Sequence, residues 1–212
     1  MRKTISQREI ATMLDVNVST VSRAINGQPG VSENLRQKIV QLARQATLHL
    51  IDTGARRVAF LGGPNWIKQA VDRKHGYLEA FRERGVPIRK ELVKCGLVSF
   101  NSGLSDTLEL LSLPEPPDAI LADHGLLSIA AFQAVIGKGL QIPSDVSVVG
   151  FMSDWVSGMS YPRMTFVKQN KKEIGCKAFK LLLDQINGND SVKHLVVSAR
   201  LNIRESTTIH KN

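Results

Sequence analysis

Residues 16–27 read VNVSTVSRAING, and this stretch decides what the first part of the chain can be. Asn17 can cap a helix over residues 18–26, and the glycine that follows provides a C-terminal stop. Val21 and Ile25 are four residues apart, so they lie on the same face of that helix. We therefore expect a short helix with one apolar face turned inward and one polar face turned outward.

Helical patterns flank this stretch on both sides. Residues 6–9, SQRE, have the spelling of a capping box, at the start of a helix that should end near Asp15. Ser32 can cap a third helix. The apolar stripe predicted for this third helix consists of Leu35, Ile39, Leu42 and Ala46. Three short amphipathic helices can close around one small core, so we predict a helix-turn-helix head over residues 1–46.

The polar face of the middle helix has the residue types that read DNA. In a helix-turn-helix the second helix lies in the major groove, where its first residues reach base edges. Arg23 can donate two hydrogen bonds to guanine, a pairing worth roughly 1–3 kcal/mol of discrimination. Val18 can contact a thymine methyl group, and Ser19 is a less selective reader. Groups that suit phosphate oxygens occur at helix ends, on Asn17, Thr20, Asn26 and Ser32.

A lone arginine at this position would more often be a solvated surface charge, and the polar residues would be only caps. The whole segment favours DNA reading. The net charge of the 212-residue chain is +9, which favours a polyanionic partner. Residues 1–50 hold seven lysines and arginines against three acids, so the head is denser in positive charge than the remainder.

Beyond residue 46 short β-rich runs alternate with helical patterns. The expected strands are 57–61, 92–98, 119–122, 146–151, 164–168 and 195–203, and the expected helices are 66–84, 103–112, 125–138 and 171–186. This alternation predicts an α/β domain, with a parallel sheet covered by helices on both faces. No run of about 18 apolar residues occurs, so we expect a cytoplasmic protein rather than a membrane protein.

The head closely resembles that of the lactose-repressor (LacI/GalR) family. The resemblance is carried by residues 4–11 (TISQREIA), by residues 16–27, and by Val31-Ser32, with the STVSR string its most specific part. It implies a sequence-specific transcriptional regulator, expected to be a repressor acting as a homodimer on a palindromic operator. The base-reading positions are then Val18, Ser19 and Arg23, and the backbone-contacting positions are Asn17, Thr20, Ser22, Asn26 and Ser32.

The remainder resembles the periplasmic-binding-protein-like core of the same family. Its landmarks are residues 54–64 (GARRVAFLGGP), 117–120 (PDAI), 142–151 (IPSDVSVVGF) and 204–207 (REST). The resemblance implies a partial effector and oligomerisation domain over residues 47–212. The family's hinge and the first part of its N-terminal core subdomain, on the order of a hundred residues, have no counterpart between head and core. We therefore expect an incomplete core and a reduced affinity for DNA.

Arg73 matches a position that often holds the effector in this family, and Asp123 falls near another such position. The resemblance thus implies a sugar-like effector. Against it, Met152 stands where the family has an acidic residue, and a thioether is a poor acceptor for a sugar hydroxyl. The alternatives are that Arg73 is a surface charge on an amphipathic helix, and that the chain is an effector-blind regulator or a small-molecule binding module with weak DNA binding.

An enzyme is the main alternative class of protein, and the residue pattern does not favour it. The five histidines are scattered, and the two cysteines, Cys95 and Cys176, have no partner at metal-ligand or redox spacing. His124 beside Asp123 could mimic an acid–base pair, but such neighbours are usually solvated or capping residues. Residues 61–64, LGGP, lack the Gly-Lys-Ser/Thr ending of a phosphate loop. We expect neither catalysis nor a bound metal or cofactor.

Overall fold

A computed structural model describes residues 33–188, residue 195 and residues 197–207 of the chain. The two predicted helices of the head, over residues 6–15 and 18–26, lie outside the described residues. No helix within the described ranges is both long and apolar enough to cross a membrane.

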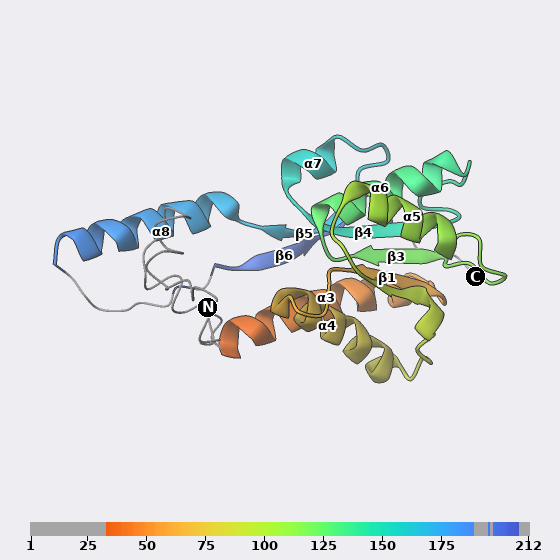
Figure 1. The fold of residues 1–212 in the computed structure, drawn as a ribbon, viewed down its shortest axis with the longest axis horizontal. Helices are drawn as coiled ribbons and strands as arrows, with labels where there is room; N and C mark the ends of the chain where they lie inside the picture. Colours follow the sequence, from red (N-terminus) through yellow and green to blue (C-terminus); the bar gives the residue numbers. More distant parts are fainter. Residues whose placement is uncertain (1–32, 189–194, 196, 208–212) are drawn as a thin grey trace, which may run out of the picture. The chain divides into compact units, whose positions relative to one another are not determined.

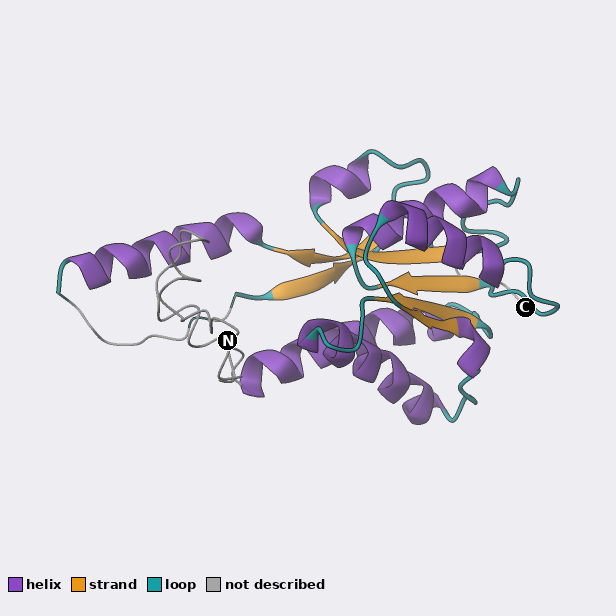
Figure 2. Cartoon of the chain, viewed as in Figure 1, coloured by secondary structure: helices purple, strands orange, loops and turns teal. Residues whose placement is uncertain are grey.

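The described part is built on a six-stranded sheet with the order β2-β1-β3-β4-β5-β6, drawn in Figure 2. Its strands are β1 (Val58–Gly62), β2 (Val93–Cys95), β3 (Ala119–Ala122), β4 (Ser147–Met152), β5 (Thr165–Gln169) and β6 (Ala199–Asn202). All neighbouring pairs are parallel except β5 and β6, which are antiparallel. The predicted parallel sheet is confirmed, with an antiparallel last strand that the sequence did not indicate.

Helices cover both faces of this sheet, as predicted (Figure 1). One face carries α3 (Glu33–Asp52) and α4 (Lys68–Arg84), and the other carries α5 (Phe100–Leu110) and α6 (Gly125–Gly137). Two short elements were not predicted, α7 (Asp154–Gly158) and the 3-10 turn η1 (Lys90–Leu92). Helix α8 (Lys171–Ile186) extends away from the sheet and has no buried residue.

Alternate residues of the central strands fill two separate core layers. In β1, Val58 and Phe60 pack with residues of α3 and α4, whereas Ala59 and Leu61 pack with residues of α5 and α6. Successive side chains of a strand point to opposite faces, so a strand covered on both sides must be apolar throughout. All residues of β1, β3 and β4 are buried for this reason.

Helix α3 is longer than predicted, and only part of its predicted stripe is buried. It continues to Asp52, and Ala43, Ala46 and Leu50 are fully buried against β1 and α4. Of the predicted stripe, Ala46 is buried as expected, Leu42 is half-buried but packs against the same core, and Ile39 is half-buried. The predicted third helix of the head is therefore also a core helix of the α/β domain. Because α3 passes residues 46 and 47 without a break, the division of the chain there stays a prediction.

The layer under α3 and α4 is centred on Tyr77. Its ring centroid lies 5.2 Å from that of Phe60 and 4.8 Å from that of Phe81, and its hydroxyl donates a hydrogen bond of 2.8 Å to the carbonyl oxygen of Val58. Burial raises the pKa of Tyr77 far above its ordinary value. The phenolate is thereby disfavoured in the folded state but not in the unfolded state.

This difference predicts a pH-dependent effect of Tyr77→Phe. At pH 7 we expect the variant to lose about 1 kcal/mol of unfolding free energy with its hydrogen bond. Since the folded-state pKa is raised, the stability from neutral Tyr77 is complete below the unfolded pKa of about 10 and is lost above it. Urea unfolding of both proteins at pH 7 and pH 11 should show the difference shrinking at pH 11. An equal difference at both pH values would contradict this interpretation.

Candidate functional site

The eight residues predicted to contact DNA all fall outside the described residues. Their roles in base reading and backbone contact therefore stay predictions. They are Val18, Ser19 and Arg23, together with Asn17, Thr20, Ser22, Asn26 and Ser32.

The two predicted effector residues meet where the parallel strands end. We call this region the carboxyl edge, and define it by Gly63 after β1, Asp123 after β3, and Phe151 and Met152 at the end of β4. Arg73 reaches it from α4, and its Nη1 donates a hydrogen bond of 2.6 Å to the backbone oxygen of Asp123. Residues fifty positions apart in the chain are thus in direct contact.

Arg73 is only 9% exposed, so it is not a solvated surface charge. Its Cζ lies 4.6 Å from the ring centroid of Phe151, in a cation–π contact. Its Nε is buried and has no hydrogen-bond acceptor. Burial lowers the pKa of Arg73, with the charge of Asp123 acting in the opposite direction. The side chain is a buried cation whose hydrogen-bonding capacity is only partly used.

Asp123 is 1% exposed and is held by the neighbouring strand end. Its Oδ2 accepts a hydrogen bond of 3.1 Å from the backbone N–H of Gly63. Burial raises the pKa of Asp123, and the Gly63 N–H and the charge of Arg73 oppose that rise. One carboxylate oxygen is therefore committed to the protein itself.

A second cation and the start of a helix lie near this pair. His124 caps α6, with its Nδ1 accepting from the N–H of Leu126 at 3.4 Å. Burial lowers the pKa of His124; the charge of Asp123 opposes this shift, and those of Arg73 and Lys171 add to it. Lys171 is the exposed first residue of α8. The charges of Arg73 and Lys171 and the start of α6 thus lie near the buried Asp123 and His124.

Two contacts of α4 were not predicted from the sequence. The ring of Phe151 lies against the guanidinium of Arg73, and the preceding residue, Asp72, accepts a hydrogen bond of 3.0 Å from Nε of Arg36 in α3. The position of Phe151 near the site could have been predicted, because ligands of open parallel sheets bind beyond the carboxyl ends of strands. The contact between Asp72 and Arg36 could not have been predicted from the sequence, since it depends on how α3 packs against α4. No group of three potential metal ligands occurs among the described residues.

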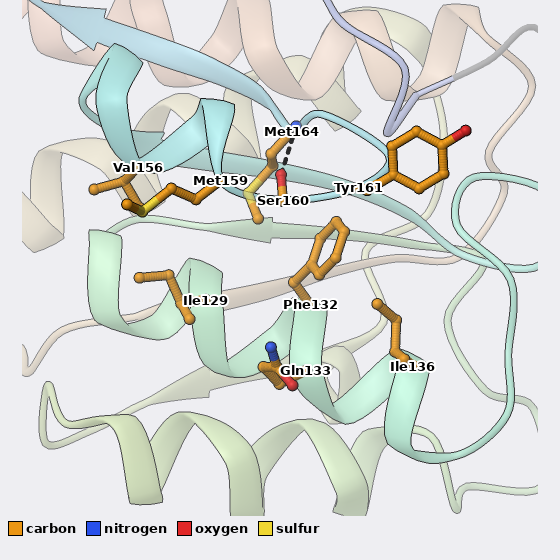
Figure 3. Close-up of a pocket in the computed structure, with 9 residues that line it drawn as sticks. All are labelled: Ile129, Phe132, Gln133, Ile136, Val156, Met159, Ser160, Tyr161 and Met164. Carbon is orange, nitrogen blue, oxygen red and sulfur yellow. Dashed lines mark hydrogen bonds between the residues drawn. The ribbon is translucent and has the colours of Figure 1, made fainter.

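A second feature is an apolar hollow between α6 and the segment that contains α7 (Figure 3). Its volume is about 370 Å³. None of its lining residues is charged, and they are Ile129, Phe132, Gln133, Ile136, Val156, Met159, Ser160, Tyr161 and Met164. Met159 is 67% exposed and Tyr161 is 92% exposed. We call these nine residues the α6–α7 face.

Two family models match the chain, one after the other. Residues 6–47 match bacterial regulatory proteins of the lacI family, and residues 47–207 match the periplasmic binding protein-like domain. The chain belongs to the lacI family of bacterial regulatory proteins. The resemblance inferred from its head and core landmarks is confirmed, together with the fold class.

Curated relatives from this family are regulators. The HTH-type transcriptional regulator CelR of Thermobifida fusca is 36% identical over 77% of this chain and 48% of that protein. The HTH-type transcriptional repressor CytR of Escherichia coli K12 is 30% identical over 69% of this chain and 43% of that protein. The chain thus matches less than half the length of these relatives.

Solved structures of family members have the same fold. A CelR–cellobiose complex aligns with a TM-score of 0.72 and 35% identity, covering 80% of this chain and 52% of that one. A lacI-family regulatory protein from Chloroflexus aggregans aligns with a TM-score of 0.73 and 32% identity, over 82% of this chain and 63% of that one.

Proposed function

We propose that this protein is a sequence-specific DNA-binding regulator that represses transcription in the bacterial cytoplasm. The observation that carries the proposal is the match of residues 6–47 to the lacI regulatory family. Within that segment Val18, Ser19 and Arg23 read bases, and Asn17, Thr20, Ser22, Asn26 and Ser32 contact the phosphate backbone. The similarity to CytR, a transcriptional repressor, supports the direction of control.

The carboxyl edge is the proposed effector site. Arg73 and Asp123 are both buried there, in contact with each other, beyond the ends of parallel strands. The solved structure of one relative, CelR, is a complex with cellobiose, and this supports an effector of sugar size for this chain. DNA binding that no effector alters would instead favour the effector-blind alternative.

Two copies of the chain are proposed to pair through the α6–α7 face. A palindromic operator has two half-sites, so it needs two heads related by a two-fold axis. The face lacks charged residues and exposes Ile136, Met159 and Tyr161 to solvent in a single copy. Gln133 lies among them. Because an amide both donates and accepts hydrogen bonds, Gln133 of one copy can form a hydrogen bond with Gln133 of the other copy across such an axis.

A DNA-binding titration tests the regulator itself. Duplexes selected from random sequence by the purified chain are expected to be palindromic, with affinity that falls steeply as salt rises. Arg23→Ala should weaken binding to a selected duplex by roughly 5- to 150-fold, from the loss of about 1–3 kcal/mol. Fluorescence anisotropy measures this directly.

The matched control is Arg82→Ala, which removes the same charge from the exposed end of α4. It should change affinity for selected and random duplexes alike, and only slightly. If Arg23→Ala behaved like Arg82→Ala, residues 18–26 would not be the reading helix.

A further inference from the structure

The guanidinium of Arg73 has one side that the protein does not use. Nη1 donates to the backbone oxygen of Asp123, and among the described residues no other group accepts a hydrogen bond from this side chain. Nε and Nη2 point the same way along the remaining side of the planar group. That pair of N–H groups matches the two oxygens of a carboxylate or a phosphate.

An unused donor in a buried position is unusual. Buried polar groups nearly always have a partner, because leaving one unpaired costs about 1–3 kcal/mol. Arg73 is nine-tenths buried, and Phe151 and Asp123 hold the guanidinium in place. The side chain is therefore positioned before any ligand arrives, which reduces the ordering that binding requires.

The surrounding charges favour an anion. Arg73 and Lys171 both act on His124, and α6 begins at Gly125 with the partial positive charge of a helix N-terminus. Asp123 is the acid whose charge acts on Arg73, and its Oδ2 accepts a hydrogen bond from the backbone N–H of Gly63. At the end of β4, where a carboxylate could accept from sugar hydroxyls, the chain has the thioether of Met152.

We propose that the effector of this chain carries a carboxylate or phosphate group, which the Nε–Nη2 side of Arg73 binds through two hydrogen bonds at the carboxyl edge. The inference rests on the proposed effector site and names the chemistry of its ligand. Two neighbouring hydroxyls of a neutral sugar can accept from the same two donors, but they bring no charge to pair with the buried cation. A sugar acid or a sugar phosphate supplies both the two oxygens and the negative charge.

Calorimetric titration of the 212-residue chain, in buffer without phosphate, tests this with pairs of ligands that differ in one group. D-glucuronate replaces the terminal CH₂OH of D-glucose by a carboxylate, and glucose 6-phosphate adds a phosphate there. We expect at least one of the two anions to bind at least tenfold more tightly than glucose. Inorganic phosphate, titrated alone, shows whether the anionic group suffices without the sugar.

Arg73→Lys keeps the charge and removes the two-donor side, so it should weaken binding of the anion at least tenfold. Arg82→Lys, at the exposed end of the same helix, should leave binding unchanged. Nitrogen-15 NMR of the arginine Nε–H groups gives an independent readout. One Nε–H resonance should shift downfield as the anion is added, and that resonance should be missing from Arg73→Lys.

Equal affinity for glucose and the two anions would overturn the proposal, and so would no binding of either anion. Anion binding that Arg73→Lys leaves intact would overturn it too, because the ion would then bind elsewhere. The comparison of glucose with the anions uses the unmodified chain, so it does not depend on whether a variant folds. If the chain bound the anion but no duplex DNA, the proposed regulator would be refuted and this inference would stand. If the chain bound DNA but preferred glucose to both anions, this inference would be refuted and the proposed regulator would stand.

Discussion

Gly76→Val is expected to destabilise the α/β domain by about 3 kcal/mol or more, enough to leave much of the protein unfolded or aggregated. Gly76 lies in α4, where α3 crosses it. A Cβ atom there would collide with the carbonyl oxygen of Val40 and would lie 2.9 Å from both the Cβ of Ala43 and the N of Arg44. Two of these three atoms belong to the backbone of α3, so they cannot move aside as a side-chain end would.

Gly175→Ala is the matched control, because Gly175 also lies inside a helix but nothing is within 4 Å of the site of its Cβ. It should be neutral or stabilising by up to about 1 kcal/mol, since alanine favours helix over glycine. Urea unfolding followed by circular dichroism measures both variants. If Gly76→Val were as stable as Gly175→Ala, α3 would not pack on α4 as described.

Met159→Asp is expected to separate the proposed dimer. Met159 is 67% exposed in one copy, so an aspartate there is tolerated by the monomer. Pairing through the α6–α7 face would bury that carboxylate among residues that offer it no cation. An unpaired buried charge costs several kcal/mol, so we expect the dimer dissociation constant to rise by roughly a hundredfold or more.

Ile203→Asp introduces the same charge at a residue that is 63% exposed and lies outside this face. Sedimentation equilibrium should show a weakened dimer for Met159→Asp and an unchanged one for Ile203→Asp. Affinity for a palindromic duplex should fall only in the first variant, while affinity for an isolated half-site should be the same in both. An intact Met159→Asp dimer would place the contact between copies elsewhere.

Most of the α/β elements could be predicted because their local patterns are strong. The strand 119–122 and the helix 171–186 have the bounds expected from sequence, and β1, β4 and α6 differ by one or two residues. Continuous apolar runs bounded by turn residues need little tertiary information. The short α7 has only five residues, too few for a helical period to show, and the antiparallel direction of β6 depends on the path of the chain after α8.

The candidate site was predictable only in part. Arg73 and Asp123 came from a family resemblance, and the structure brings them into contact. Neither the resemblance nor the spacing could show that Nη1 is occupied and that Nε is left without an acceptor. That distinction depends on side-chain positions near Phe151, which are set by the packing of α4 on the sheet.

The sequence by itself determined the family of the chain, through its head and core landmarks, and the alternation that makes an α/β domain. Only the tertiary structure decided which face of α3 is buried. In α3 the apolar and small residues spread over more than one stripe, so periodicity alone allows either Ile39 and Leu42 or Ala43 and Leu50 to face a core. Tertiary packing buries Ala43 and Leu50 completely and Leu42 only in part, because the small side chain of Ala43 allows α3 to lie directly against Gly76 of α4.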